Sequence, residues 1–155
     1  MKGSDKAKLG GSLTFPGTSM TVHRMKIISV IARFLLGLIF LVFGLNGFLH
    51  FIHQPPLTGI AGQFIGALFV SHYLVPIFLL QIVSAVLLLV NRYVPLALTL
   101  LAPIIVNVLL IHILMAPSGL PLALVVTMLW FVVFLSVRSA FYGLLQPRVE
   151  ARALR

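Results

Sequence analysis

Long apolar runs separated by short polar turns dominate the chain from residue 27 onward. Four of these runs are long enough to cross the ~30 Å hydrocarbon core of a bilayer, which takes a helix of about 20 residues. They cover residues 27–52, 72–90, 94–115 and 120–139. None of them has the polar face that a helix in a soluble bundle needs. The pattern therefore predicts an all-α, integral membrane four-helix bundle.

The stretch between the first two runs has a different pattern. Pro55 and Pro56 stop the first helix, because proline lacks the backbone N–H that an α-helix needs. The apolar run that follows, residues 64–70, is too short to cross a bilayer. We expect a short interfacial or re-entrant helix here, packed on the outer ends of the spans.

The two ends of the chain are polar. Residues 1–24 are rich in Gly, Ser, Thr and Lys, and they carry too little apolar surface to fold, which predicts a disordered cytoplasmic tail. Residues 25–143 are the predicted membrane domain, and residues 144–155 are a second cytoplasmic tail. Met25 is a second candidate for the start of the protein, because the segment that follows it already reads as the beginning of a membrane protein.

Composition and charge support a membrane protein and predict its orientation. Hydrophobic residues make up 61% of the chain and charged residues 8%, against about 25% charged in soluble domains. The net charge is +9, but the basic residues flank apolar spans instead of lining a groove, so we exclude nucleic acid and expect contact with the lipid bilayer. All eleven Lys and Arg residues fall on one side of the predicted spans. The positive-inside rule then places both termini and Arg92 in the cytoplasm.

The lack of cysteine in the chain and of acidic residues in its apolar region excludes several kinds of active site. The chain has no cysteine, which excludes disulfides, thiol redox motifs and cysteine-bound metal centres. Its two acidic residues, Asp5 and Glu150, both lie outside the apolar region. A carboxylate proton relay or carboxylate metal site within the membrane is therefore excluded.

Several stretches, taken in order, resemble the DoxX family of small four-helix integral membrane proteins. The resemblance covers residues 25–142. It is carried by RFLLGLIFLVFGLNGFLHF in the first span, QIVSAVLLLVNRYVPLALTLLAP across the second and third, and NVLLIHILMAPSGLPLAL into the fourth. Many relatives carry an acidic residue in the second span, where this chain has Gln81, and this difference argues against a proton-linked role.

The resemblance implies a multi-pass protein of the bacterial or archaeal cytoplasmic membrane. Some relatives are subunits of quinone-linked oxidoreductases, so we expect a subunit of, or partner to, a membrane redox system, with a quinone or lipid pocket in the outer half of the bundle. We expect no enzyme activity from the chain alone and assign no catalytic residue. The alternatives are a non-catalytic membrane anchor or assembly protein and, with less support, a transporter of a small solute.

Three amides inside the spans are the first candidates for the pocket: Asn46, Gln81 and Asn107. Counted at about 1.5 Å per residue, all three lie in the outer half of the bundle. An amide that faces lipid would leave its donors and acceptors without partners, so we expect all three to point inward and to converge. Hydrogen bonding between helices is the alternative to a ligand role.

Histidines near the outer surface are the second set of candidates: His50, His53, His72 and His112. Neutral imidazoles bind metals or haem, or hydrogen-bond a quinone carbonyl, so these four are weak metal candidates. Histidine at a membrane surface is also common without any ligand, because the ring has an apolar body and a polar tip. The predicted ligand-pocket residues are Asn46, His50, Gln81, Asn107 and His112.

Two further features concern packing. Gly37, Gly44 and Gly47 lie in the first span, where small residues let helices approach closely. Arg33 lies one turn inside the same span, and we expect its side chain to extend to the cytoplasmic surface.

Overall fold

The computed structural model describes residues 17–53 and 56–145, and every regular element in these residues is helical. The α-helices are α1 (Gly17–Leu49), α2 (Gly59–Val70), α3 (Leu74–Leu89), α4 (Val94–Leu114) and α5 (Leu120–Val137). Two 3-10 helices, η1 (Pro117–Gly119) and η2 (Arg138–Leu145), flank α5. The predicted all-α fold class is confirmed.

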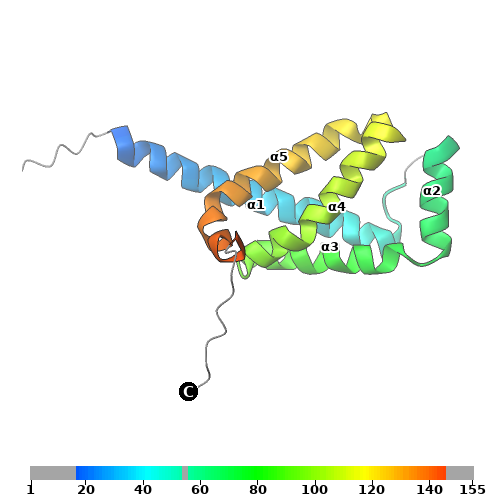
Figure 1. Ribbon diagram of the computed structural model, residues 1–155, viewed down its shortest axis with the longest axis horizontal. Helices are drawn as coiled ribbons and strands as arrows, with labels where there is room; N and C mark the ends of the chain where they lie inside the picture. Colours follow the sequence, from blue (N-terminus) through cyan, green and yellow to red (C-terminus); the bar gives the residue numbers. More distant parts are fainter. Residues whose placement is uncertain (1–16, 54–55, 146–155) are drawn as a thin grey trace, which may run out of the picture.

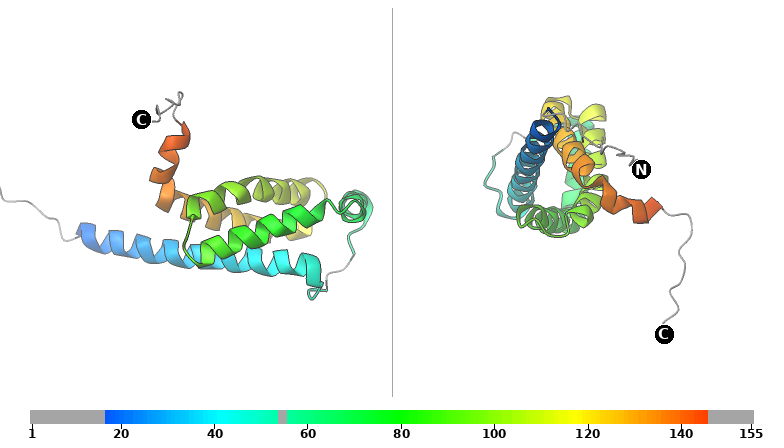
Figure 2. Two further views of the ribbon diagram at one scale, coloured as in Figure 1. Left: turned by 90° about the horizontal axis from the view of Figure 1, so that it is seen from below. Right: turned by 90° about the vertical axis from the view of Figure 1, so that its left-hand side faces the viewer.

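Four of the helices form a bundle around one core. α1 packs against α3 and α5, and α4 packs against the same two helices, so that α1 and α4 lie diagonally opposite (Figures 1 and 2). Following the predicted orientation, we call the end of the bundle that carries Arg92 the inner end and the opposite end the outer end. The first turns of α1 extend beyond the inner end (Figure 1).

Length and composition make this bundle a membrane protein. Three segments are long and apolar enough to cross a bilayer alone: Arg24–Leu49, Val94–Leu114 and Pro117–Tyr142. α3 has 16 residues, or about 24 Å at 1.5 Å per residue, and it passes the same test only together with α2. By length and composition, the described residues therefore contain three candidate spans, or four if α2 and α3 count as one bent span.

The predicted short helix before the second span is present as α2, and it is longer than the apolar run that indicated it. α2 and α3 meet at 86°, so α2 runs across the outer end of the bundle (Figure 1). Gly59 starts α2 with φ +62°, a conformation that glycine adopts without strain. α2 is not one of the helices packed around the core. It makes little contact with the bundle helices, and most of its residues are exposed.

The first helix differs from the prediction at both of its ends. α1 begins at Gly17, so residues 17–24, which we assigned to a disordered tail, are helical. Extending an existing helix by a turn costs less than starting a new one, so a long apolar helix carries its polar neighbours with it. α1 stops at Leu49 instead of residue 52, because His50 takes a left-handed conformation with φ 51°. Residues 1–16 and 146–155 of the predicted tails lie outside the described residues.

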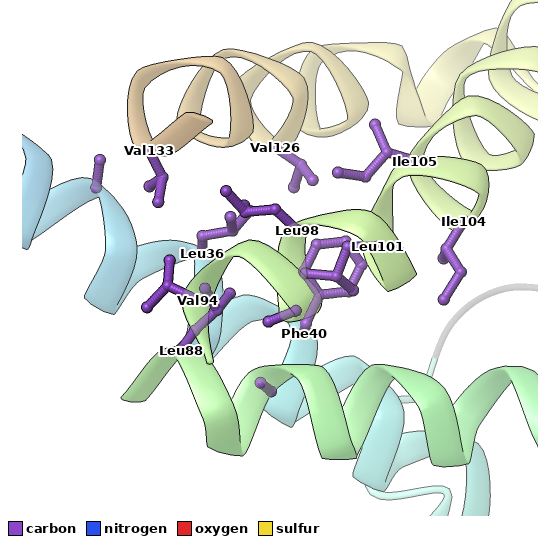
Figure 3. Close-up of a cluster of buried hydrophobic side chains, with 13 residues drawn as sticks. Leu36, Phe40, Leu88, Val94, Leu98, Leu101, Ile104, Ile105, Val126 and Val133 are labelled. Atoms are coloured by element: carbon purple, nitrogen blue, oxygen red, sulfur yellow. The ribbon is translucent and has the colours of Figure 1, made fainter. Parts of the chain in front are cut away.

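The core is built from hydrophobic side chains of all four bundle helices, and all of them except Phe40 are aliphatic (Figure 3). The largest fully buried hydrophobic side chains are Leu36 of α1, Leu88 of α3, Leu98 and Leu101 of α4, and Val133 of α5. Trp130 of α5 lies beside this cluster and donates a hydrogen bond from Nε1 to the Leu98 carbonyl (3.0 Å). The tryptophan therefore ties α5 to α4 through the α4 backbone.

Glycines bring α1 and α3 close together, as predicted. A Cβ atom added at Gly37 would lie 3.0 Å from the Leu89 side chain. One added at Gly44 would lie 2.9 Å from Ile82 Cγ1 and 3.3 Å from the Ile82 backbone nitrogen. Neither position leaves room for a larger residue, so these glycines set the distance between the two helices.

Arg33 is buried between helices, which differs from the predicted extension to the surface. Its side chain is 8% exposed, and Nη1 donates a hydrogen bond to the Leu88 carbonyl in the last turn of α3. A cation at this position satisfies a helix-terminal carbonyl and opposes the negative end of the α3 dipole. Arg33 therefore links α1 to the inner end of α3.

Candidate functional site

A pocket lies at the outer end, where α1 and α2 stop and α3 begins. Its volume is about 190 Å³, and it is half open to the surroundings. Its lining residues come from the ends of these three helices and are mostly apolar: Gly47, Phe48, His50, Phe69, His72, Leu74, Val75 and Phe78. Aromatic rings and two imidazoles thus lie together at the outer end of the bundle.

Local backbone geometry brings the two histidines to this pocket. His50 directly follows α1 and His72 lies just after α2, and both have left-handed φ values, 51° and 59°. Histidine is among the few non-glycine residues enriched in this conformation. The backbone N–H of His50 is bonded to the Asn46 carbonyl (2.9 Å), and that of His72 to the Phe69 carbonyl (3.0 Å). Each histidine therefore ends a helix and turns the chain at the rim of the pocket.

Asn46 holds the turn after α1. Its side-chain Oδ1 accepts a hydrogen bond from the Ile52 backbone N–H (2.6 Å), while its backbone carbonyl accepts the one from His50. The amide is half-buried and does not line the pocket. Asn46 therefore fixes the position of His50 from one turn away.

The His50 ring is oriented within its own turn. Nδ1 lies 3.1 Å from the Phe48 carbonyl, which can only accept a hydrogen bond, so Nδ1 carries the proton. In the neutral ring Nε2 is then an acceptor. The ring also meets Phe69 edge-on at a centroid distance of 6.0 Å. Among the described residues, His50 therefore offers one nitrogen without a hydrogen-bond partner beside an aromatic surface.

The phenylalanines of the pocket were not among the predicted site residues. Phe48 of α1 and Phe78 of α3 meet edge-on at a centroid distance of 5.9 Å, and Phe78 fills the space above Gly47. Such rings make a surface on which a flat ligand can stack. Phe48 and Phe69 lie near the predicted ends of the first span and of the short helix, but phenylalanine is so common in apolar spans that this signal did not stand out.

The histidines do not form a metal centre in the part of the chain that the structure describes. No group of three or more metal-binding side chains occurs there. His53 is exposed and lies outside the pocket. His112 sits at the turn between α4 and α5, where Nδ1 lies 2.9 Å from the Ala116 carbonyl and the ring packs over Gly119. His112 therefore stabilises a turn, and the weak metal prediction for the four histidines has no geometric support in the described residues.

The three amides do not converge as expected. Gln81 is buried in α3 at 8% exposure, and its Oε1 has no hydrogen-bond partner among the described residues. Ser84, one turn along the same face, is fully buried and its Oγ likewise has none there. Asn107 is instead exposed on the outside of α4, and Nδ2 bonds to the Pro103 carbonyl of its own helix (3.0 Å). The expectation that Asn107 points inward is therefore wrong, because this bond to its own helix replaced the expected partner.

Of the five predicted ligand-pocket residues, the structure places only His50 on the pocket wall. Asn46 supports it through the turn, and Gln81 lies deeper on α3. Comparison of the chain with protein-family models, with curated proteins and with solved structures gave no match.

Proposed function

We propose that this chain is a DoxX-like integral membrane protein that serves as a subunit of, or partner to, a membrane redox system. In this proposal both termini are cytoplasmic and the membrane is that of a bacterium or archaeon. The pocket at the outer end holds the head of a quinone or of a lipid. The three stretches that resemble the DoxX family and the chemistry of the pocket support the proposal.

The observation that carries the proposal is the combination of two imidazoles with three phenyl rings at one end of an apolar bundle. Aromatic faces accommodate a flat ring by stacking. A neutral imidazole hydrogen-bonds a polar group on that ring. The volume of about 190 Å³ is below the roughly 300–1,000 Å³ that encloses a drug-sized ligand. It suits the head of a long amphipathic molecule whose tail stays among the lipids.

A binding role fits the available groups better than independent catalysis. The pocket wall has imidazoles but neither a thiol nor a carboxylate, because the chain lacks cysteine and its two acids are at residues 5 and 150. An imidazole without a carboxylate to orient it is a weaker general base than one in a catalytic triad. Electron transfer would therefore belong to a partner, with this chain holding the carrier.

The test is to purify the full chain in mild detergent and to measure bound quinones and lipids by mass spectrometry. We expect a quinone or a specific lipid at close to one molecule per chain. His72→Gln and Phe78→Leu should lower this ratio several-fold. His53→Gln is the matched control, because His53 lies outside the pocket, and it should leave the ratio unchanged. Equal retention in all variants, or no bound molecule above the level of bulk lipid, would contradict the proposal.

A non-catalytic anchor is the second candidate, and one observation favours it. The two pocket histidines already act as helix stops with left-handed backbone, a structural role that needs no ligand. An anchor should purify without quinone and should still bring down a partner protein. The mass-spectrometric measurement therefore separates the two functions.

A further inference from the structure

Asn107 presents a polar group on the lipid-facing surface of the bundle. It lies about 20 Å along α4 from Val94 and about 10 Å from Leu114. These distances place it within the ~30 Å hydrocarbon core. Among the described residues its carboxamide makes one hydrogen bond, the one to Pro103, which uses one of its two N–H groups. Oδ1 and the second N–H have no partner among the described residues, and the exposed side chain faces lipid tails, which offer none.

The surroundings of Asn107 have the pattern of a helix-packing face. Most exposed residues of α4 recur at alternating spacings of three and four, which is the repeat of a helix that packs along a seam. Six of the eight exposed residues follow this repeat: Leu96, Thr99, Pro103, Val106, Leu110 and Ile113. The other two, Asn107 and Leu114, each follow directly after a residue of the repeat. Asn107 borders this seam next to Val106. The Thr99 hydroxyl is already bonded to the Pro95 carbonyl (2.9 Å), which leaves Asn107 as the polar group that a partner would satisfy.

We propose that this outer face of α4 binds the same face of a second copy of the chain. A carboxamide both donates and accepts, so two Asn107 side chains related by a twofold axis satisfy each other with reciprocal hydrogen bonds. Two copies inserted in the same direction bring the same residues together around such an axis. Because the two Asn107 side chains must meet, this pairing also sets the register of the two helices. The inference does not depend on the proposed ligand or redox role.

Asn107 is a better anchor for a symmetric partner than for lipid or an unrelated helix. A lipid tail cannot hydrogen-bond it, and its side chain is too short to reach a headgroup about 10 Å away. A different helix would need its own polar residue at the same depth. The second copy supplies that residue by symmetry.

The absence of cysteine from the chain makes disulfide crosslinking a direct test. Leu110→Cys on the seam and Leu124→Cys on α5 are a matched pair, because the native side chains are 48% and 53% exposed. Each also lies four residues from the outer end of its helix. After mild oxidation of native membranes, we expect Leu110→Cys to give a covalent dimer of the chain and Leu124→Cys to remain monomeric. Equal crosslinking at both positions, or a Leu110→Cys adduct with another protein, would overturn the proposal.

A second measurement tests the role of Asn107 itself. In liposomes of graded protein-to-lipid ratio, dimerisation is followed by energy transfer between labelled copies. Loss of an interhelical hydrogen bond in a membrane costs a factor of roughly 3 on average and roughly 18 at most. We expect Asn107→Leu to raise the dissociation constant at least about 3-fold, and Asn107→Gln, which keeps the carboxamide, to restore much of the association. A dimer of unchanged affinity in Asn107→Leu, or a wild-type chain that stays monomeric at every ratio, would refute the assignment.

Discussion

Polar side chains in the bundle are used mainly to bind the backbone. Arg33 bonds to the Leu88 carbonyl, Trp130 to the Leu98 carbonyl, and Asn46 to the Ile52 N–H. Lipid supplies no hydrogen-bond partners, so a polar group within the bilayer must find one in the protein. Helix ends are where backbone groups lack partners within the helix. Two of these side chains, Arg33 and Asn46, act at or just beyond a helix end.

Arg33 gives the first prediction at this scale. Arg33→Met keeps most of the side-chain volume and removes the hydrogen bond to Leu88. A hydrogen bond to a charged group contributes about 1.5–3 kcal/mol, but the Leu88 carbonyl keeps the Asn91 N–H (3.2 Å) as a second partner. We therefore expect the free energy of unfolding to fall by about 1–2 kcal/mol, measured by SDS titration in mixed micelles. Lys26→Met, on the exposed side of α1, should change it by less than about 0.5 kcal/mol. Equal effects of the two substitutions would show that the Arg33 contact does not stabilise the bundle.

At the scale of elements, the starts of α4 and α5 could be predicted from the sequence, but the end of α1 could not. Pro95 and Pro121 lie in the first turns of α4 and α5, where a missing N–H costs nothing. The starts predicted from the apolar runs, residues 94 and 120, agree with the observed helices. The end of α1 was harder, because nothing in the sequence showed that His50 would take a left-handed conformation and end the helix three residues before the predicted end.

The contact of α1 with α3 gives the second prediction. A methyl group at Gly44 would meet both the side chain and the backbone nitrogen of Ile82, so the helices must separate. We expect Gly44→Ala to lower the free energy of unfolding by about 1–2 kcal/mol, because overpacking outweighs the gain in helix propensity.

Gly66→Ala on α2 is the matched control for this substitution. Gly66 has no atom within 4 Å of its added Cβ, and the change should be neutral or raise the free energy of unfolding by up to about 1 kcal/mol. The SDS titration compares the two variants directly. A Gly44→Ala variant as stable as Gly66→Ala would mean that α1 and α3 pack less closely than described.

At the scale of the whole molecule, the fold class could be predicted from hydrophobicity alone, but the inward faces of the helices could not. In a soluble bundle, polar residues mark the outside of each helix. Here lipid and core are both apolar, so Leu36 at the centre and Leu38 on the surface look alike in the sequence. The glycines of α1 correctly indicated a close helix contact, because two helices approach closely only where small residues lie between them, whether the surroundings are core or lipid. The prediction for Asn107 was wrong, because its amide bonds to the Pro103 carbonyl of its own helix instead of to a neighbouring helix.

Topology gives the last prediction, because it decides which end of the bundle faces the cytoplasm. All eleven basic residues lie at the inner end or in the two tails, and moving such charges across a membrane is what the positive-inside rule disfavours. Reporter fusions after Leu57 and after Ser118 should therefore be external, and fusions at Arg92 and Arg155 cytoplasmic. The 86° angle between α2 and α3 adds a sharper test. If α3 crosses the bilayer and α2 lies along its surface, fluorescent labels on Ile60→Cys and Val70→Cys should sit at nearly equal depth. If α2 instead continued the span, the two labels would differ in depth by about 15 Å. A cytoplasmic reporter at Leu57 would reverse the arrangement of the molecule and would place the pocket on the cytoplasmic side.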